Sequence, residues 1–229
     1  MKKRTTFFKI LTSALLAATF GAATFAFSAC SGQTDYFSCV SELRSDVFCG
    51  ENDNFAVTVY SGFKEKPYCH DGEKGETNLM LTVKLFEKQK IDEQITIKIE
   101  YGGESYEKPL DYNPVSRALS CDAEVNSLPE KKLNLTLSYG ETSVPVELES
   151  KLNPDTVSYT VALEKATSKA ADFLRENSGA GTFNGEISIR LLCENERNYY
   201  YVGFILKSGL KQAYLIDGKS GEILAEKKI

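Results

Sequence analysis

An alternation of apolar and polar residues recurs between Tyr36 and Ser150, and it constrains the fold more than any other feature of the chain. Six runs show it clearly, at residues 55–60, 79–86, 95–101, 117–125, 133–139 and 144–148. Successive side chains of a strand point to opposite faces, so a period of two places one apolar face against a core and one polar face toward solvent. No run with helical spacing interrupts the series. The pattern therefore predicts a mainly antiparallel β domain with short connections.

Two turns that contain glycine join neighbouring runs. Gly102 and Gly103 follow the third run, and Gly140 follows the fifth. Glycine readily adopts the positive φ of two-residue hairpins, so both positions predict tight hairpins. The hairpins at 97–106 and 135–144 are similar in sequence. This similarity indicates either an internal duplication or, as we favour, the shared chemistry of Tyr-Gly turns.

Seven or so such strands with no helix between them predict a β-sandwich over residues 30–152. The sequence contains no tryptophan, so the Cys–Trp–Cys core of immunoglobulin domains cannot form. We therefore expect an antiparallel β-sandwich that is immunoglobulin-like in architecture alone.

The apolar period changes at residues 152–155, which marks the expected start of a second domain over 153–229. Apolar residues then recur at helical spacing, at Leu163, Ala166, Ala170, Phe173 and Leu174. Ser158 or Thr160 is the expected N-cap of this helix, and Gly179 is its expected C-cap. Further strands are predicted at 186–193, 199–207, 212–216 and 222–227. The segment predicts an α+β domain in which one helix packs on an antiparallel sheet.

Two motifs in these strands resemble a known family. The chain reads Tyr199-Tyr-Tyr-Val-Gly-Phe204 and later Ala213-Tyr-Leu-Ile-Asp-Gly-Lys-Ser-Gly-Glu-Ile-Leu224. Together with the preceding helix, they resemble a PepSY domain over about residues 155–229. The resemblance implies a helix on an antiparallel sheet and a binding or peptidase-regulating role without catalytic residues. Asp217 and Gly221 then have structural roles in a turn.

The first 29 residues resemble a bacterial lipoprotein signal peptide. Residues 1–9 carry four basic and no acidic side chains, and residues 10–27 are almost wholly apolar or small. Cys30 follows Phe27-Ser28-Ala29, as the acylated cysteine follows a lipobox, although Phe27 stands where leucine is usual. The resemblance implies cleavage before Cys30 and a protein held by lipid on the cell membrane, facing outside the cytoplasm.

Two alternatives also place the chain outside the cytoplasm. Ordinary signal cleavage near residues 26–28 would leave Cys30 as a free thiol. An uncleaved apolar run of about eighteen residues is near the lower limit for spanning a bilayer.

Removal of residues 1–29 leaves 23 basic and 32 acidic residues, a net charge of −9. This excess of acid argues against nucleic acid as a partner and against a second, polybasic attachment to lipid.

Five cysteines remain besides Cys30, so at least one thiol stays free. Cys39 and Cys49 flank a polar segment, and a hairpin turn there would bring their sulfur atoms together in a disulfide. A zinc site built from Cys39, Cys49, Cys69 and His70 matches no known ligand spacing. We therefore expect no metal.

No catalytic constellation emerges from the sequence. His70 is the only histidine and lies in Cys69-His70-Asp71, but neighbours in an extended segment point to opposite faces. Gly218-Lys219-Ser220 lacks the earlier glycine of a phosphate-binding loop, because Ala213 stands in its place. We expect a protein that is not an enzyme and that needs no cofactor.

The candidate binding surface is the run Tyr199, Tyr200 and Tyr201. In a strand, Tyr199 and Tyr201 share one face while Tyr200 takes the other, so ordinary packing against the helix is the alternative role. Our first hypothesis is a non-enzymatic binding or regulatory module whose partner is an envelope peptidase. The second is a structural or adhesive module that binds cell wall or glycan. A hydrolase that uses Cys69 is the least favoured.

Overall fold

The computed structural model describes residues 35–179 and 182–229. The expected signal peptide and Cys30 lie outside the described residues. Asp35–Ile229 form one compact unit, which is mainly β, as the alternation predicts. None of the helices in the described ranges is long and apolar enough to cross a membrane.

Most of the expected strands are present with longer bounds than the alternation indicated. In chain order, the first elements are the 3-10 helix η1 (Tyr36–Cys39) and the strands β1 (Val40–Glu51), β2 (Phe55–Glu65), β3 (Thr77–Glu87), β4 (Thr96–Tyr101), β5 (Glu104–Pro109), β6 (Asp111–Asn113), β7 (Ala118–Glu124), β8 (Lys132–Tyr139) and β9 (Thr142–Ser150). They are followed by α2 (Tyr159–Lys169), α3 (Ala171–Glu176), β10 (Ser178–Gly179), β11 (Thr182–Phe183), β12 (Gly185–Glu194), β13 (Arg197–Leu206), β14 (Lys211–Asp217) and β15 (Ile223–Lys228).

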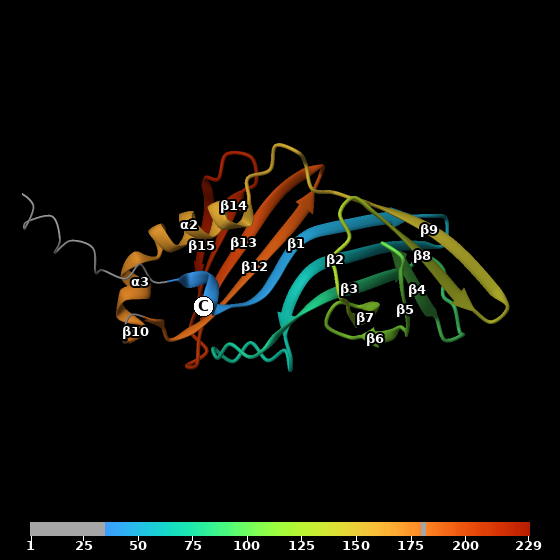
Figure 1. Cartoon of the computed structure of the whole chain (residues 1–229), viewed down its shortest axis with the longest axis horizontal. Coiled ribbons are helices and arrows are strands. Elements are labelled where there is room, and N and C mark those ends of the chain that lie inside the picture. The colour runs from blue at the N-terminus through green and yellow to red at the C-terminus, as the bar shows by residue number, and fades with distance from the viewer. Residues whose placement is uncertain (1–34, 180–181) are drawn as a thin grey trace, which may run out of the picture. The chain divides into compact units, whose positions relative to one another are not determined.

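Thirteen of these strands belong to one sheet (Figure 1). Its longest path runs β15-β14-β13-β12-β1-β2-β3-β7-β6. At the far end of β1, β9 also pairs with that strand and adds β8, β4 and β5 as a second branch. Neighbouring strands are antiparallel except β1 and β12, which run parallel. Because β5 contacts β7, the sheet curls round until its two branches meet.

The curled part of the sheet encloses one hydrophobic cluster, which we call the sheet core. Its central side chains are fully buried and include Phe48, Val59, Leu81, Val83, Leu85, Ile97, Ile99 and Leu137. In β3 the buried Val83 lies between Thr82 and Lys84, which are partly exposed. This alternation in the structure confirms the period of two on which the strand predictions rest.

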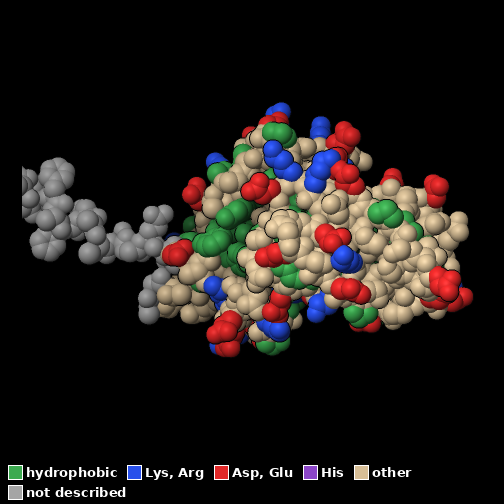
Figure 2. Space-filling model, turned by 45° about the vertical axis from the view of Figure 1, so that its right-hand side comes forward, with side chains coloured by type: hydrophobic (Ala, Val, Ile, Leu, Met, Phe, Trp, Pro, Cys, Tyr) green, Lys and Arg blue, Asp and Glu red, His purple; other side chains and the backbone are tan. Residues whose placement is uncertain are grey.

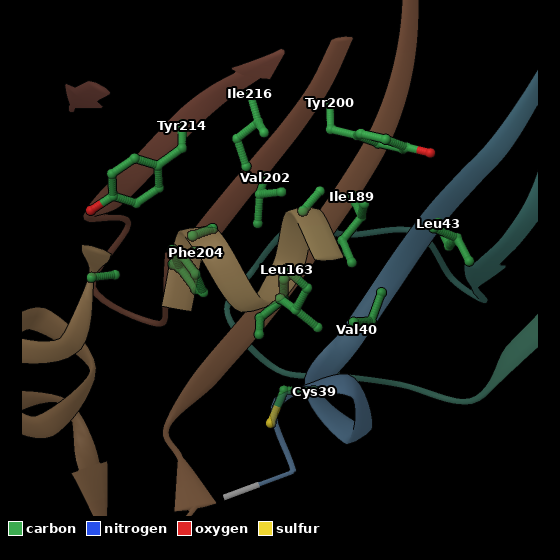
Figure 3. Close-up of a cluster of buried hydrophobic side chains, with 14 of the residues drawn as sticks. Cys39, Val40, Leu43, Leu163, Ile189, Tyr200, Val202, Phe204, Tyr214 and Ile216 are labelled. Carbon is green, nitrogen blue, oxygen red and sulfur yellow. The ribbon is translucent and has the colours of Figure 1, made fainter. Parts of the chain in front are cut away.

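A second cluster, the helix core, lies between the helices and the C-terminal strands (Figure 3). Leu163 of α2 points toward Ile189, Val202 and Phe204 on β12 and β13. Cys39, Val40 and Leu43 extend into the same cluster from η1 and β1. The first strand of the chain therefore completes the core of its C-terminal third.

The expected helix is divided into two, α2 and α3, which meet at Ala170. At its start, the Ser158 hydroxyl accepts a hydrogen bond from the Val161 N–H at 3.4 Å, so the predicted N-cap is confirmed. The Ser158 cap satisfies one of the backbone donors that a helix leaves free in its first turn.

The predicted C-cap, Gly179, is wrong. The helix ends at Glu176, and Gly179 instead pairs with Thr182 in a two-stranded ribbon. The side chains of Asn177 and Ser178 donate hydrogen bonds to carbonyl groups in the last helical turn, at 2.8 and 2.6 Å. Polar side chains that bond the backbone in this way compete with continued helix, which explains the earlier stop.

The turn expected at residues 42–46 is also wrong, because β1 runs unbroken from Val40 to Glu51. A β-bulge lies there instead and leaves Ser45 unpaired with β2. Gly62, opposite the bulge, lets the two strands approach closely. A Cβ atom on Gly62 would lie 1.8 Å from the Leu43 carbonyl oxygen.

Candidate functional site

Charged and polar side chains gather where β1 meets β12, on the face of the sheet opposite the helices. We call them the Glu42 cluster, and its members are Glu42, Arg44, Tyr68, His70, Ser188 and Arg190. The parallel pairing sets Glu42 beside Ser188 and Arg44 beside Arg190. Residues 66–76, which link β2 to β3, supply the tyrosine and the histidine. Alternation along both strands directs these polar side chains away from the helix core.

Glu42 is the centre of the cluster, and only 3% of its side chain is exposed. Its Oε1 accepts a hydrogen bond from Arg44 Nε at 2.7 Å. Its Oε2 accepts from Tyr68 Oη at 2.6 Å, from Ser188 Oγ at 2.9 Å and from Arg190 Nε at 2.6 Å. Two guanidinium groups thus face one carboxylate, which leaves the cluster with an excess of positive charge.

Burial and charge fix the protonation states of these groups. Burial alone would raise the pKa of Glu42, but the nearby His70, whose Nε2 lies 3.8 Å from Oε2, and the charges of Arg44 and Arg190 together hold that pKa well below its usual range. Burial and the negative charge of Glu42 raise the pKa of Tyr68 well above that of an ordinary phenol. At neutral pH the carboxylate therefore stays charged and the phenol stays protonated.

His70 lies at the edge of the cluster, with its backbone in the left-handed region at φ 52°. Its Nε2 contacts the Tyr68 hydroxyl and lies 2.9 Å from Arg190 Nη2. Cys69 is exposed, and none of the hydrogen bonds among residues 35–179 and 182–229 joins it to His70. Within the described residues, the histidine thus belongs to a hydrogen-bonded cluster that does not include the Cys69 thiol.

A groove of about 550 Å³ opens beside the cluster and shares Tyr68 with it. We call it the lysine–tyrosine groove, because Lys64, Lys66, Lys108, Tyr68 and Tyr106 line it together with Met80 and the acids Glu65, Asp122 and Glu124. Lys64 pairs with Asp122 and Lys66 pairs with Glu124, whereas Lys108 takes part in none of the ion pairs of the described residues. The lining is therefore balanced in charge, with one cation available to a ligand.

Cations lie over tyrosine rings along this face of the sheet. The Arg44 guanidinium is 4.4 Å from the centre of the Tyr60 ring, and Lys64 Nζ is 4.9 Å from that of Tyr68. Such contacts hold the ring and the cation in place. Figure 2 shows acidic and basic side chains interspersed over the visible surface, with hydrophobic side chains gathered in smaller areas.

The three tyrosines proposed as a binding surface do not act together. Tyr200 is 2% exposed, packs in the helix core and donates a hydrogen bond to the Val157 carbonyl oxygen at 3.0 Å. Tyr199 and Tyr201 are half-buried and point to the opposite face, as alternation requires. Tyr201 lies under the Arg190 guanidinium, 5.7 Å from its ring centre. An exposed surface here can include Tyr199 and Tyr201 but not Tyr200.

The expected Cys39–Cys49 disulfide is not formed, and both thiols are free. Cys39 ends η1, and Cys49 lies near the far end of the extended strand β1, so roughly 30 Å of strand separates their Cα atoms at about 3.3 Å per residue. A disulfide needs Cα atoms within about 7 Å. The Cys39 thiol is buried beside the Phe183 carbonyl oxygen, and the Cys49 thiol contacts Thr58.

Sequence reasoning did not identify Glu42 or Arg190 as members of a site. Glu42 stands in a polar segment that indicates a turn, and Arg190 alternates with apolar residues on a strand, so both patterns predict ordinary solvated positions. These side chains are buried only because β1 pairs with β12 and because residues 66–76 cover them. The one available signal was His70, the single histidine, in a segment that otherwise reads as an exposed loop.

No family model matches this chain, and comparisons with curated proteins and with solved structures give no match either.

Proposed function

We propose that this chain is a non-enzymatic binding module of the cell envelope and that the lysine–tyrosine groove holds its ligand. The observation that carries the proposal is the position of an open, polar groove directly against the Glu42 cluster, whose charges are fixed. Tyrosines from two separate segments, Tyr68 and Tyr106, line it with three lysines. A fixed polar wall and aromatic rings suit the recognition of an extended polar chain.

The charge states of the cluster support a binding role over a catalytic one. General acid–base catalysis works best with groups whose pKa lies near the working pH. The pKa of Glu42 is shifted downward and that of Tyr68 upward, so both move away from neutrality. These groups are suited to holding a fixed pattern of charge.

An envelope peptidase, bound through one of its polar segments, is our first proposed partner. The resemblance of residues 155–229 to PepSY domains supports it. Cell wall or glycan is the second candidate, and the tyrosines of the groove favour it, because sugar rings pack on aromatic faces.

The finer architecture and the location belong to the same proposal. We infer an immunoglobulin-like sandwich over residues 30–152, a PepSY-like domain over 153–229 and a lipid anchor on Cys30. Alternating strands and the helix-then-strand order support the first two. An acyl-sized gain in intact mass, lost in a Cys30→Ala variant, is the expected sign of the anchor, and an unmodified mass would exclude it.

A charge reversal in the groove tests the proposed function. Lys108→Glu changes the lining without breaking an ion pair, and Lys165→Glu on the exposed side of α2 is the matched control. The mature protein is assayed for inhibition of peptidases secreted by the same cells and for binding to isolated cell-wall fragments. We expect Lys108→Glu to weaken either the peptidase inhibition or the cell-wall binding at least tenfold, a loss of about 1.4 kcal/mol in binding free energy. The Lys165→Glu control should bind like the parent protein.

The two assays separate the candidate partners. Inhibition without wall binding identifies the peptidase, and the reverse identifies the wall or glycan. Absence of both activities, or equal activity in both variants, would overturn the proposal.

A further inference from the structure

A second cleft, of about 400 Å³, lies on the other face of the sheet, between the sheet core and the helix core. Its walls come from β1 and β2, from residues 128–129 between β7 and β8, and from residues 152–159 at the entry to α2. We call it the Asp46 cleft. Leu128, Pro129, Leu152 and Val157 make much of its lining apolar. Volume and lining are in the range of small-molecule and side-chain pockets.

Among the residues that the structure describes, Asp46 is the only charged side chain that lines this cleft. The residue is 8% exposed, and its Oδ1 accepts hydrogen bonds from the Val47 N–H at 2.7 Å and from Ser150 Oγ at 2.8 Å. Its Oδ2 accepts only from the same Ser150 hydroxyl, at 2.8 Å. Asp46 takes part in none of the ion pairs found in the described part of the chain. A carboxylate thus faces an apolar cleft with one oxygen incompletely bonded and no counter-charge.

The environment of Asp46 confirms that its charge is poorly compensated. Burial raises its pKa, although the hydrogen bonds from Ser150 and Val47 act in the opposite direction. Next to it in the paired strands lies Ser61, which is 1% exposed and whose hydroxyl has no hydrogen-bond partner. The Ser61 hydroxyl can donate or accept a hydrogen bond, so it adds a neutral polar group to this end of the cleft but no positive charge.

Tyr200 adds an acceptor to the same end of the cleft. Its hydroxyl donates to the Val157 carbonyl oxygen at 3.0 Å, so the lone pairs of the phenol oxygen remain available. Burial and the charge of Asp46 raise the pKa of Tyr200 to about 12, which keeps the phenol neutral. A carboxylate beside the hydroxyl oxygens of Tyr200 and Ser61, with apolar side chains near them, suits a ligand with several donors and a single positive charge.

We propose that the Asp46 cleft binds a primary ammonium group carried on an apolar chain, as in the lysine side chain of a peptide. The ammonium supplies the missing counter-charge and three donors, and its methylene stem lies along the leucines and Val157. This site is separate from the lysine–tyrosine groove, so the inference stands or falls independently of the proposed function.

Other cations fit the cleft less well. A guanidinium recognises both oxygens of a carboxylate side by side, but Oδ1 of Asp46 is already occupied by Val47 and Ser150. A divalent ion such as Ca²⁺ takes six to eight oxygen ligands, usually with several carboxylates. Asp46 is the only carboxylate in this lining.

Titration with a small lysine derivative tests the proposal. The probe is Nα-acetyl-lysine N-methylamide, and its Nε-acetylated form is the neutral control ligand of the same chain. Binding to the mature protein is followed by amide chemical shifts, with Val47, Ser61 and Val157 as reporters. We expect saturable shifts at these residues with the lysine probe and at least tenfold weaker binding of the neutral form.

Two variants assign the effect to Asp46. Asp46→Asn keeps an acceptor for the Val47 N–H and is expected to lose at least tenfold in affinity. Leu152→Lys leaves Asp46 intact but introduces a competing ammonium, because Leu152 lines the cleft and is 40% exposed. It is expected to abolish binding of the probe, whereas Leu210→Lys, at a similarly exposed leucine outside the cleft, is not.

Equal binding of the charged and neutral probes would overturn the proposal, as would shifts confined to other residues. If Asp46→Asn fails to fold, the comparison of Leu152→Lys with Leu210→Lys still tests the proposal, because neither substitution alters the hydrogen bonds of Asp46.

Discussion

The pKa values of buried acids in this sheet shift in opposite directions because their neighbours differ. Glu42 faces two arginines and its pKa falls. Glu186 is equally buried, but the Gly72 N–H donates to its Oε1 at 3.2 Å and its Oε2 has no partner. Glu65, whose Oε1 is also unpartnered, adds like charge nearby. Burial and then this charge raise the pKa of Glu186, against opposing contributions from Ser41, Gly72 and His70.

Replacement of Glu186 by glutamine should therefore stabilise the protein near neutral pH. Because the pKa of Glu186 is raised in the folded protein, protonation of this side chain stabilises the folded state below pH 4.5, the ordinary glutamate pKa. This stabilisation is lost as the pH rises through the raised pKa. Glutamine stays neutral throughout. We expect a gain of about 1 kcal/mol at pH 7, the lower end of the cost of an unpaired buried group, and little gain below pH 4.5.

Urea unfolding at pH 7 and pH 4 measures this difference. Glu107→Gln is the control, because Glu107 is exposed. An equal gain at both pH values would show that the gain does not come from the charge of Glu186, and no gain at pH 7 would show that this buried charge costs little.

At the scale of elements, the bulge in β1 decides the shape of the site. It changes the register between β1 and β2, so that Arg44 lies opposite Gly62 and Asp46 lies opposite Ser61. Glu42 and Arg44 then face the polar side, while Asp46 lines the cleft on the other face. A single inserted residue, Ser45, thus separates the two candidate sites.

Gly62→Ala should weaken this arrangement. The added Cβ would meet the Leu43 carbonyl oxygen at 1.8 Å, and this obstacle is backbone that cannot rotate away. Overpacking of this kind costs about 1–3 kcal/mol. Chemical denaturation measures the loss, and Gly75→Ala is the control, because its Cβ would meet only the Glu65 side chain, at 3.4 Å or more.

Gly75→Ala should stay within about 0.5 kcal/mol of the parent protein. Equal stability of both variants would mean that the strands separate at the bulge at little cost.

At the scale of the whole molecule, the N-terminal strand belongs to both cores. Phe48 lies in the sheet core, whereas Val40 and Leu43 lie in the helix core. The parallel pairing of β1 with β12 joins residues that are far apart in the chain. Residues on both sides of the proposed boundary near 152 therefore share one hydrophobic cluster.

Residues 153–229 made alone should fail to fold cooperatively. The fragment lacks η1 and β1, so the helix core loses Cys39, Val40 and Leu43, and β12 keeps β13 but loses its other neighbouring strand. We expect poorly dispersed amide signals from this fragment and recovery of native signals when residues 31–152 are added. Cooperative thermal unfolding of the fragment alone would contradict this and would support an independent second domain.

The strands β2, β3, β4, β7, β8 and β9 could be predicted because each follows from local alternation, whereas β5 and β6 have no such run. Turns at Gly102 and Gly140 follow from the positive φ that glycine adopts there, at 56° and 53°. The N-cap Ser158 is likewise local. Prediction failed where the signal was not local, as at residues 42–46, whose polar side chains indicate a turn but belong to a bulged strand.

The sequence by itself determined most of the strands, the hairpins, the helical segment and the acidic net charge of the chain, because these depend on neighbouring residues and on composition. Only the tertiary structure decided that β12 lies beside β1, that Glu42 meets Arg190 and that Asp46 faces a cleft without a counter-charge. Those contacts join residues more than a hundred positions apart. Whether a polar side chain on a strand is solvated or buried depends on what the fold places against it, and local alternation carries no information about that.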